Sequence, residues 1–247
     1  MSTSPPLPFQ IKICGLTKPQ QAVDAREAGA DAIGLNFYEP SIRFVTNEQA
    51  LAIAKAVRNT THERPPCVIG VFVNHSRDQI IQLAAAVGLD GIQLHGDETI
   101  DFFTDLKKSV AKQFRSTPLP FFVRALRTQP NTDQSARDSG LQAQRITSQI
   151  QAWSTAGVDT ILLDAAAIGE FGGTGKSIDW HLMPQLQASS ERPLALAGGL
   201  TPTNVQEAIQ IAQVDMVDVA SGVESPKGVK CPILVKQFVQ QARLALV

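Results

Sequence analysis

One motif recurs four times in this chain and limits the folds that the chain can adopt. In each copy an aspartate lies between the end of a helical stretch and a short apolar run; these residues are Asp31, Asp90, Asp159 and Asp215, separated by 59, 69 and 56 residues. In the first three copies a glycine two positions earlier can take the positive φ that ends a helix, and the aspartate turns the chain into a strand. A unit that recurs in this way indicates a repetitive architecture of helices and strands.

Further apolar runs between these motifs complete an alternation of strands and helices. The expected strands are residues 10–14, 29–35, 68–73, 88–94, 119–125, 157–163, 193–197 and 214–219. The expected helices are residues 18–29, 47–59, 76–87, 99–112, 142–156, 179–188, 201–212 and 231–245. Strands that alternate with helices of this length indicate parallel βαβ units. Eight such units in 247 residues match an α/β fold, the closed (β/α)8 or TIM barrel.

An open, doubly wound sheet is the alternative architecture. Such a sheet needs a nucleotide-binding fingerprint after its first strand, and the chain has Cys14-Gly15-Leu16-Thr17 at that place. A polar stretch at about 127–141 interrupts the alternation and has little apolar surface to bury. We expect it to be a mobile surface insertion between the fifth strand and its helix. Because it has no core of its own, residues 1–247 are expected to form a single barrel domain.

Charge and composition exclude several classes of protein. The chain has 22 Lys and Arg against 23 Asp and Glu, so it lacks the basic excess that nucleic-acid binding requires. No apolar run approaches the ~18 residues that span a bilayer, and the first residues do not resemble a secretory signal. We therefore expect a cytoplasmic protein without nucleic-acid or membrane partners. Its cysteines, Cys14, Cys67 and Cys231, are spaced for neither a disulfide framework nor a metal site.

Glycine-rich turns follow the last three expected strands. They contain Gly172, Gly173 and Gly175 after the sixth strand, Gly198 and Gly199 after the seventh, and Ser221 and Gly222 after the eighth. In a (β/α)8 barrel these turns meet at the rim that carries the active site. Because glycine lets backbone N–H groups approach an anion, we expect the turns to bind the phosphate of a small substrate. A triphosphate-binding P-loop is out of register, since it would need glycine where Glu170 stands.

Two residues at strand ends are candidates for proton transfer. Cys14 ends the first strand and Asp164 ends the sixth, so their side chains can face each other across the mouth of the barrel. A thiol and a carboxyl group so placed can divide the transfer of protons, and the apolar neighbours of Asp164 favour the protonated form of a general acid. The alternatives are an unreactive buried Cys14 and an Asp164 that caps a turn.

Three further polar residues are candidates for substrate binding. Arg43, in the loop after the second strand, can bind a carboxylate through two hydrogen bonds. His95 ends the fourth strand and is either a site residue or a structural histidine. Asp218, in the eighth strand, can bind a sugar hydroxyl or hold neighbouring backbone groups.

Six segments of the chain, taken in order, carry a family resemblance. They are Lys12-Ile-Cys-Gly-Leu-Thr17, Gly70-Val-Phe-Val-Asn74, Gln93-Leu-His-Gly96, Gly172-Gly-Thr-Gly-Lys176, Ala197-Gly-Gly-Leu-Thr-Pro202 and Asp218-Val-Ala-Ser-Gly-Val-Glu224. Together they resemble the phosphoribosylanthranilate isomerase family of tryptophan biosynthesis. The resemblance implies an Amadori rearrangement, without a cofactor, of N-(5-phosphoribosyl)anthranilate to 1-(2-carboxyphenylamino)-1-deoxyribulose 5-phosphate. It also implies Cys14 as general base, Asp164 as general acid, Arg43 as the partner of the anthranilate carboxylate, and a phosphate held by the glycine-rich turns.

Two other functions remain open at this point. The aminoaldose isomerase of the histidine pathway performs the same kind of rearrangement but resembles a two-aspartate arrangement, which Cys14 does not match. A barrel that binds a phosphorylated ligand without catalysis would keep the glycine turns and would need neither Cys14 nor Asp164. The sequence is compatible with a monomer and with a homodimer.

Overall fold

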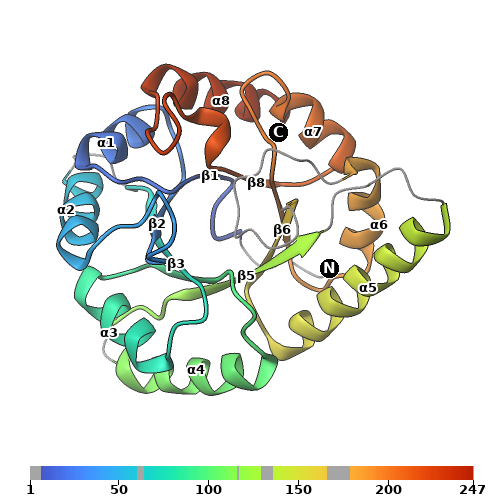
Figure 1. Cartoon of the computed structure of the whole chain (residues 1–247), viewed down its shortest axis with the longest axis horizontal. Coiled ribbons are helices and arrows are strands. Elements are labelled where there is room, and N and C mark those ends of the chain that lie inside the picture. Colours follow the sequence, from blue (N-terminus) through green and yellow to red (C-terminus); the bar gives the residue numbers. More distant parts are fainter. Residues whose placement is uncertain (1–6, 60–63, 116, 129–135, 166–178, 247) are drawn as a thin grey trace.

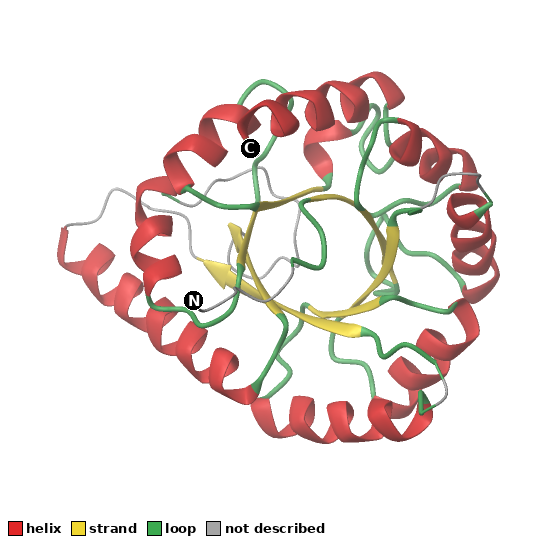
Figure 2. Cartoon of the chain, turned by 180° about the vertical axis from the view of Figure 1, so that it is seen from behind, coloured by secondary structure: helices red, strands yellow, loops and turns green. Residues whose placement is uncertain are grey.

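The computed structural model describes residues 7–59, 64–115, 117–128, 136–165 and 179–246. Its strands are all parallel and form a closed barrel in chain order, from β1 to β8 and back to β1. The helices form a ring around this barrel, as Figure 1 shows, and Figure 2 shows the same closed ring of strands from behind. The (β/α)8 fold predicted from the sequence is therefore confirmed.

The elements alternate along the chain. The strands are β1 (Ile11–Cys14), β2 (Ala32–Asn36), β3 (Cys67–Phe72), β4 (Gly91–Leu94), β5 (Phe121–Thr128), β6 (Thr160–Ala165), β7 (Leu194–Ala197) and β8 (Met216–Val219). The helices are α1 (Pro19–Glu27), α2 (Asn47–Arg58), α3 (Arg77–Val87), α4 (Ile100–Gln113), α5 (Ala136–Ala156), α6 (Met183–Ala188), α7 (Val205–Ala212) and α8 (Pro232–Ala245). Two 3-10 helices, η1 (Trp180–Leu182) and η2 (Ser221–Val223), precede α6 and follow β8. None of the helices in the described ranges has the length and apolar character needed to cross a membrane.

Side chains alternate along each strand between two apolar layers. Ile11 and Ile13 of β1 are fully buried in the larger cluster, which also contains the buried side chains of the surrounding helices. A smaller cluster lies inside the barrel and consists of Phe9, Ala32, Ile69, Val123, Ala125, Leu162, Ala195, Ala197 and Met216. Alternate residues of a strand share a face, so Lys12 and Cys14 point into the barrel, opposite to the two isoleucines. The barrel interior therefore holds charged and reactive side chains as well as this apolar cluster.

The recurring aspartates have a structural role at the N-terminal ends of the even-numbered strands. In the first three copies the aspartate exchanges two hydrogen bonds with one residue of the preceding strand. Its carboxylate Oδ2 accepts from that residue's N–H, and its own N–H donates to that residue's carbonyl. The pairs are Asp31 with Ile11 (2.8 and 2.9 Å), Asp90 with Val68 (2.8 and 2.8 Å) and Asp159 with Phe122 (2.7 and 3.0 Å). Each pair fixes the register between an odd-numbered strand and the next strand.

Basic side chains from the helices hold the same turns. In each of the three copies, the carbonyl of the glycine before the aspartate accepts a hydrogen bond from a helix that lies earlier in the ring. The donors are Arg243 of α8 to Gly29, Arg58 of α2 to Gly88 and Lys107 of α4 to Gly157. Arg243 and Arg58 also form ion pairs with Asp31 and Asp90. Three of the strand pairs, β1–β2, β3–β4 and β5–β6, are thus each closed by a helix of the pair before it in the ring.

Two helices begin later than the sequence predicted. We expected a helix from residue 201, but α7 begins at Val205. Asn204 Oδ1 accepts a hydrogen bond from Thr201 N at 2.7 Å, which holds residues 201–204 in a turn. The helix expected over 179–188 is divided into η1 and α6, and Asp179 caps the 3-10 part by accepting from the N–H of His181.

The polar stretch at 127–141 is in part regular structure. Residues 127 and 128 end β5, and α5 begins at Ala136, six residues before the expected start. No proline occurs in residues 136–141, so the turn-forming composition there does not prevent a helix. Residues 129–135 lie outside the described part of the chain. The mobility that we expected for them stays a prediction.

The aspartate–strand hydrogen bonds generate a prediction about stability. We expect Asp159→Ala to lower the free energy of unfolding by about 1–3 kcal/mol, because it leaves the N–H of Phe122 without its acceptor. Urea unfolding followed by circular dichroism measures this change. Asp215→Ala is the matched control, since Asp215 occupies the same place in the motif but is exposed. Equal effects of the two substitutions would contradict the role given to the Asp159 carboxylate.

Candidate active site

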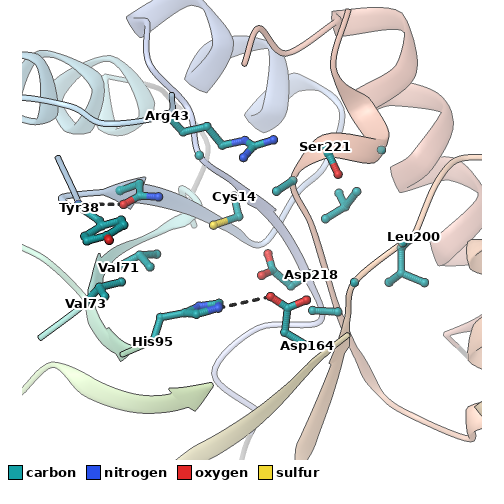
Figure 3. Close-up of a pocket in the computed structure, with 18 residues that line it drawn as sticks. Cys14, Tyr38, Arg43, Val71, Val73, His95, Asp164, Leu200, Asp218 and Ser221 are labelled. Atoms are coloured by element: carbon teal, nitrogen blue, oxygen red, sulfur yellow. Dashed lines mark hydrogen bonds and ion pairs between the residues drawn. The ribbon is translucent and has the colours of Figure 1, made fainter. Parts of the chain in front are cut away.

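A pocket opens where the C-terminal ends of the strands meet. Of the twelve site residues predicted from the sequence, nine line it: Cys14, Arg43, His95, Asp164, Gly198, Gly199, Asp218, Ser221 and Gly222. The other three, Gly172, Gly173 and Gly175, lie outside the described residues. Figure 3 shows the thiol of Cys14 and the carboxylates of Asp164 and Asp218 directed into this one space.

The thiol of Cys14 occupies room that the neighbouring strand leaves open. A Cβ atom on Gly34 of β2 would lie 2.7 Å from Cys14 Sγ, so a side chain at position 34 would collide with the thiol. Burial raises the pKa of the Cys14 thiol, while the ammonium groups of Lys12 and Lys230 act to lower it. Burial dominates, so the pKa of Cys14 is raised overall, and the two lysines limit the rise.

Asp164 faces His95 across the pocket. His95 Nε2 lies 3.3 Å from Asp164 Oδ2, and both side chains are almost fully buried. The other imidazole nitrogen, Nδ1, is 2.9 Å from the amide nitrogen of Gln93. An amide nitrogen only donates, so Nδ1 accepts in this orientation and a neutral His95 carries its proton on Nε2, towards Asp164. The sequence showed only the apolar chain neighbours of Asp164, and the structure adds the imidazole of His95 beside its carboxylate.

Glu98 holds the loop that follows His95. Its carboxylate accepts hydrogen bonds from the N–H of Gly96 at 2.9 Å and of Asn74 at 2.8 Å, and it is paired with Arg124 at 2.7 Å. The Glu98 side chain is buried, so these charge-assisted bonds act in a medium of low dielectric constant. Loops after β3 and β4 are thereby tied together beside His95.

Asp218 forms a contact that the sequence did not predict. Its Oδ1 lies 3.0 Å from Nζ of Lys12, and the two residues are register neighbours on β8 and β1. We expected Asp218 to bind a sugar hydroxyl or backbone groups, and in the structure it forms an ion pair inside the barrel. The Lys12 side chain is fully buried, with 0% of its surface exposed.

Arg43 already binds a carboxylate within the protein. Its Nε and Nη2 donate to the two carboxylate oxygens of Glu224 at 2.6 and 2.8 Å, the bidentate geometry expected of arginine with a carboxylate. Lys230 donates to the same carboxylate at 2.6 Å. Burial acts to raise the pKa of Glu224, but the hydrogen bonds from Arg43 and Lys230 outweigh it and lower the pKa to about 2.

The loop after β2 is folded so that Arg43 reaches the pocket. Asn36 ends β2, and its amide nitrogen donates to Oγ of Ser41 at 3.1 Å. The same hydroxyl accepts a hydrogen bond from the backbone N–H of Arg43 at 3.1 Å. At the other side of the loop, a Cβ atom on Gly15 would lie 2.4 Å from Cδ of Arg43, so the arginine lies against bare backbone of the loop after β1.

Two of the predicted glycine turns meet at the pocket. Gly198 and Gly199 have φ angles of 84° and 68°, which favour glycine over other residues. A Cβ atom on Gly222 would lie 1.8 Å from the carbonyl oxygen of Leu200, so the turns after β7 and β8 touch backbone to backbone. Because no side chains surround them, the backbone N–H groups of these turns can approach an anion at the rim.

Three charged residues next to Cys14 and Arg43 were not predicted: Lys12, Glu224 and Lys230. Lys12 could have been found from strand alternation, because it lies two residues before Cys14 and therefore shares its face. Glu224 and Lys230 gave no local signal. Glu224 belongs to a quoted motif, but its partner Arg43 is 181 positions away in the chain.

The fold and the pocket together define a (β/α)8 barrel with a thiol and a carboxyl group placed for proton transfer beside a glycine-rich rim. Comparison with known proteins identifies which barrel this is. The family model described as N-(5'phosphoribosyl)anthranilate (PRA) isomerase matches residues 11–140 and 131–241. The chain belongs to this family of isomerases, as its motifs indicated.

Individual relatives agree with this assignment. An N-(5'-phosphoribosyl)anthranilate isomerase of Pseudomonas fluorescens (strain SBW25) is 41% identical, over 94% of this chain and 94% of its own. A relative of the same name from Acinetobacter calcoaceticus is 37% identical, over 94% and 95%. The crystal structure of phosphoribosyl anthranilate isomerase from Thermotoga maritima has a TM-score of 0.74 and 29% identity, over 95% of this chain and 98% of its own. A phosphoribosyl anthranilate isomerase in complex with reduced 1-(o-carboxyphenylamino)-1-deoxyribulose 5-phosphate has a TM-score of 0.70 and 30% identity, with the same coverage.

The low pKa of Glu224 generates a prediction about stability and pH. An unfolded glutamate has a pKa of ~4.3, so ionised Glu224 stabilises the fold above that pH, and the stabilisation is lost as the pH falls towards 2. We expect Glu224→Gln to be less stable than the unchanged chain at pH 7, by up to ~3 kcal/mol. The difference should shrink between pH 5 and pH 3 in urea unfolding measurements.

The matched control for this experiment is Glu207→Gln. Glu207 is exposed on α7, so its substitution should change the unfolding free energy little at any of these pH values. If the Glu224→Gln difference were the same at pH 7 and pH 3, the ionised carboxylate would not be what stabilises this cluster.

Proposed function

We propose that this chain converts N-(5'-phosphoribosyl)anthranilate to 1-(2-carboxyphenylamino)-1-deoxyribulose 5-phosphate, with Cys14 as general base and Asp164 as general acid. One observation carries the assignment of roles: the thiol and the carboxyl group reach a single pocket from β1 and β6. The conversion is a step of tryptophan biosynthesis, to which the family belongs.

Asp164 starts the reaction. In its protonated form it donates a proton to the ring oxygen of the ribose, the C1–O bond breaks, and the nitrogen lone pair forms an iminium with C1. The carboxylate that remains faces Nε2 of His95 at 3.3 Å, which stabilises the developing negative charge. His95 therefore acts on the substrate through Asp164.

Cys14 completes the proton transfer. The iminium nitrogen withdraws electrons from C1 and acidifies the hydrogen on C2, and the thiolate of Cys14 removes that proton. The C2–H electron pair forms a C1–C2 double bond, and the former iminium electrons return to nitrogen as a lone pair. The enolamine then tautomerises to the ketone. Because the substrate nitrogen accepts the electrons, the scheme requires no metal or redox cofactor.

The two ends of the substrate have separate partners in the proposal. The edge of the Arg43 guanidinium that Glu224 does not engage binds the anthranilate carboxylate. The turns at Gly198–Gly199 and Ser221–Gly222 hold the phosphate, together with the glycines after β6. The compound bound in the similar crystal structure carries both a carboxyphenyl group and a 5-phosphate, which supports this division.

We also propose that the chain works in the cytoplasm, as a monomer or a homodimer. One similar structure, 29% identical with a TM-score of 0.72, is of monomers generated from a dimeric isomerase of Thermotoga maritima. Light scattering on the purified chain distinguishes the two states.

Loss of either proton-transfer group should abolish most of the turnover. We expect Cys14→Ala and Asp164→Asn each to lower kcat by roughly 10²–10⁴-fold, about 3–5 kcal/mol of transition-state stabilisation. Fluorescence of the anthranilate group follows consumption of the substrate, and titration with a reduced product analogue measures binding separately. Binding should change little in either variant.

Matched controls separate the roles from general damage. Cys67→Ala removes a thiol at the start of β3, and Asp215→Asn removes an exposed carboxylate before β8; both should leave kcat unchanged. Full turnover in Cys14→Ala or Asp164→Asn would refute the corresponding role. A chain that binds the analogue but never turns over the substrate would be a ligand-binding barrel.

The assignment of Arg43 is tested with two substrates. We expect Arg43→Ala to raise KM for the anthranilate substrate by at least about 10-fold, because a charge-assisted pair with a carboxylate is lost. The corresponding phosphoribosyl aniline, which lacks the carboxylate, should be affected far less. Arg77→Ala, at an exposed arginine of α3, is the control. Equal effects on both substrates would remove Arg43 from carboxylate recognition.

A further inference from the structure

A charged side chain lies directly behind the reactive thiol. Lys12 and Cys14 are two residues apart on β1 and point into the barrel together. The Lys12 ammonium is fully buried and lies 3.0 Å from Oδ1 of Asp218 on the adjoining strand. A buried ammonium has three N–H groups that need acceptors, and one carboxylate oxygen accounts for one of them.

The barrel interior is shaped around this lysine. Ala32 of β2 is its register neighbour, and a Cβ atom on Gly34 would lie 3.2 Å from Cε of Lys12. The same hypothetical atom would also lie 2.7 Å from Cys14 Sγ. Gly34 thus leaves room for both the aliphatic stem of the lysine and the thiol, and the two groups share that space.

The charges around Cys14 favour a negative sulfur. Groups from several elements face it: Lys12 of β1, Asp218 of β8, Glu224 and Lys230 of the segment between β8 and α8, Arg43 of the loop after β2, and His95 and Asp164 across the pocket. Apart from His95 and Asp164 across the pocket, three cations (Lys12, Arg43 and Lys230) face two carboxylates (Asp218 and Glu224), an excess of one positive charge. Lys230 and Arg43 share the carboxylate of Glu224, whereas within the described part of the chain Lys12 forms an ion pair with Asp218 alone. A thiolate at Cys14 balances the excess.

We propose that Lys12 is the positioning residue that stabilises the thiolate of Cys14 through its buried ammonium group, with Asp218 holding that ammonium in place. This inference deepens the proposed function, because it names what activates the base. It does not make Lys12 a proton-transfer group, since the ammonium stays charged throughout.

Lys12 and Asp218 act on the pKa of the Cys14 thiol in opposite directions. Burial acts to lower the pKa of Lys12, but the charges of Asp218 and Cys14 outweigh it and raise the pKa, so the ammonium keeps its proton. For Cys14, burial raises the pKa, Lys12 lowers it, and Asp218 raises it. Removing Lys12 should therefore raise the pKa of the Cys14 thiol, and removing the charge of Asp218 should lower it. A merely structural role of Lys12 would not produce these opposite shifts.

The experiment measures the thiol without any substrate. Iodoacetamide alkylates a thiolate, and the rate at Cys14, located by peptide mass analysis, gives the midpoint of its ionisation when it is followed between pH 6 and pH 11. We expect Lys12→Met to raise this midpoint by about one pH unit or more, as loss of an adjacent opposite charge does. Asp218→Asn should lower it. Lys55→Met, at an exposed position of α2, should leave it unchanged.

A double variant guards against misfolding. Lys12→Met leaves a buried carboxylate without its cation, whereas Lys12→Met with Asp218→Asn removes both charges. The midpoint in the double variant should lie above that of Asp218→Asn alone, and circular dichroism establishes that each variant is folded. Equal midpoints in these two variants, or a shift of Lys12→Met and Asp218→Asn in the same direction, would overturn the proposal.

The outcome is separable from that of the proposed function. The unchanged chain is assayed with N-(5'-phosphoribosyl)anthranilate in parallel. Absence of turnover there, with the expected midpoint shifts present, would reject the isomerase activity and keep the role of Lys12. Normal turnover without the midpoint shifts would support the isomerase activity and reject the role of Lys12.

Discussion

Reciprocal hydrogen bonds between recurring aspartates and the strands before them fix the register of this barrel. Register matters here because a strand displaced by one residue presents its other face. A slip of β1 would turn Lys12 and Cys14 out towards the helices and bring the two isoleucines of that strand into the barrel. The geometry of the pocket at one end of the strands therefore depends on contacts at the opposite end.

The pocket also depends on charges that are held away from water. Ion pairs of Lys12 with Asp218, Arg43 with Glu224 and Arg124 with Glu98 are all largely buried. Such pairs add little net stability, yet losing one partner leaves an uncompensated charge in a medium of low dielectric constant. Each pair thus keeps its members in one arrangement. Around the pocket, that arrangement fixes the guanidinium at the rim, the loop beside His95 and the ammonium behind the thiol.

The sequence predicted the fold and the location of Cys14 and Asp164 more successfully than the residues around them. The repeated motif gave the strand order, and strand alternation together with the barrel rule put Cys14 and Asp164 at one rim, where the pocket has them. The partner of Arg43 could not be predicted, because Glu224 is 181 positions away and becomes its neighbour only when β8 closes against β1. Helix starts were missed for local reasons. Asn204 bonds back to Thr201 and delays α7, whereas α5 begins early because a polar composition does not by itself prevent a helix.

The contact between α8 and the first aspartate turn has a consequence for biosynthesis of the chain. Arg243 bonds to Gly29 and pairs with Asp31, 212 positions away, and its guanidinium also reaches Gln10 just before β1. On a ribosome Arg243 is made 212 positions after the aspartate of the turn that it secures. The outer edge of β1 therefore stays unpaired until β8 is made, and the first aspartate turn lacks its arginine until α8 follows.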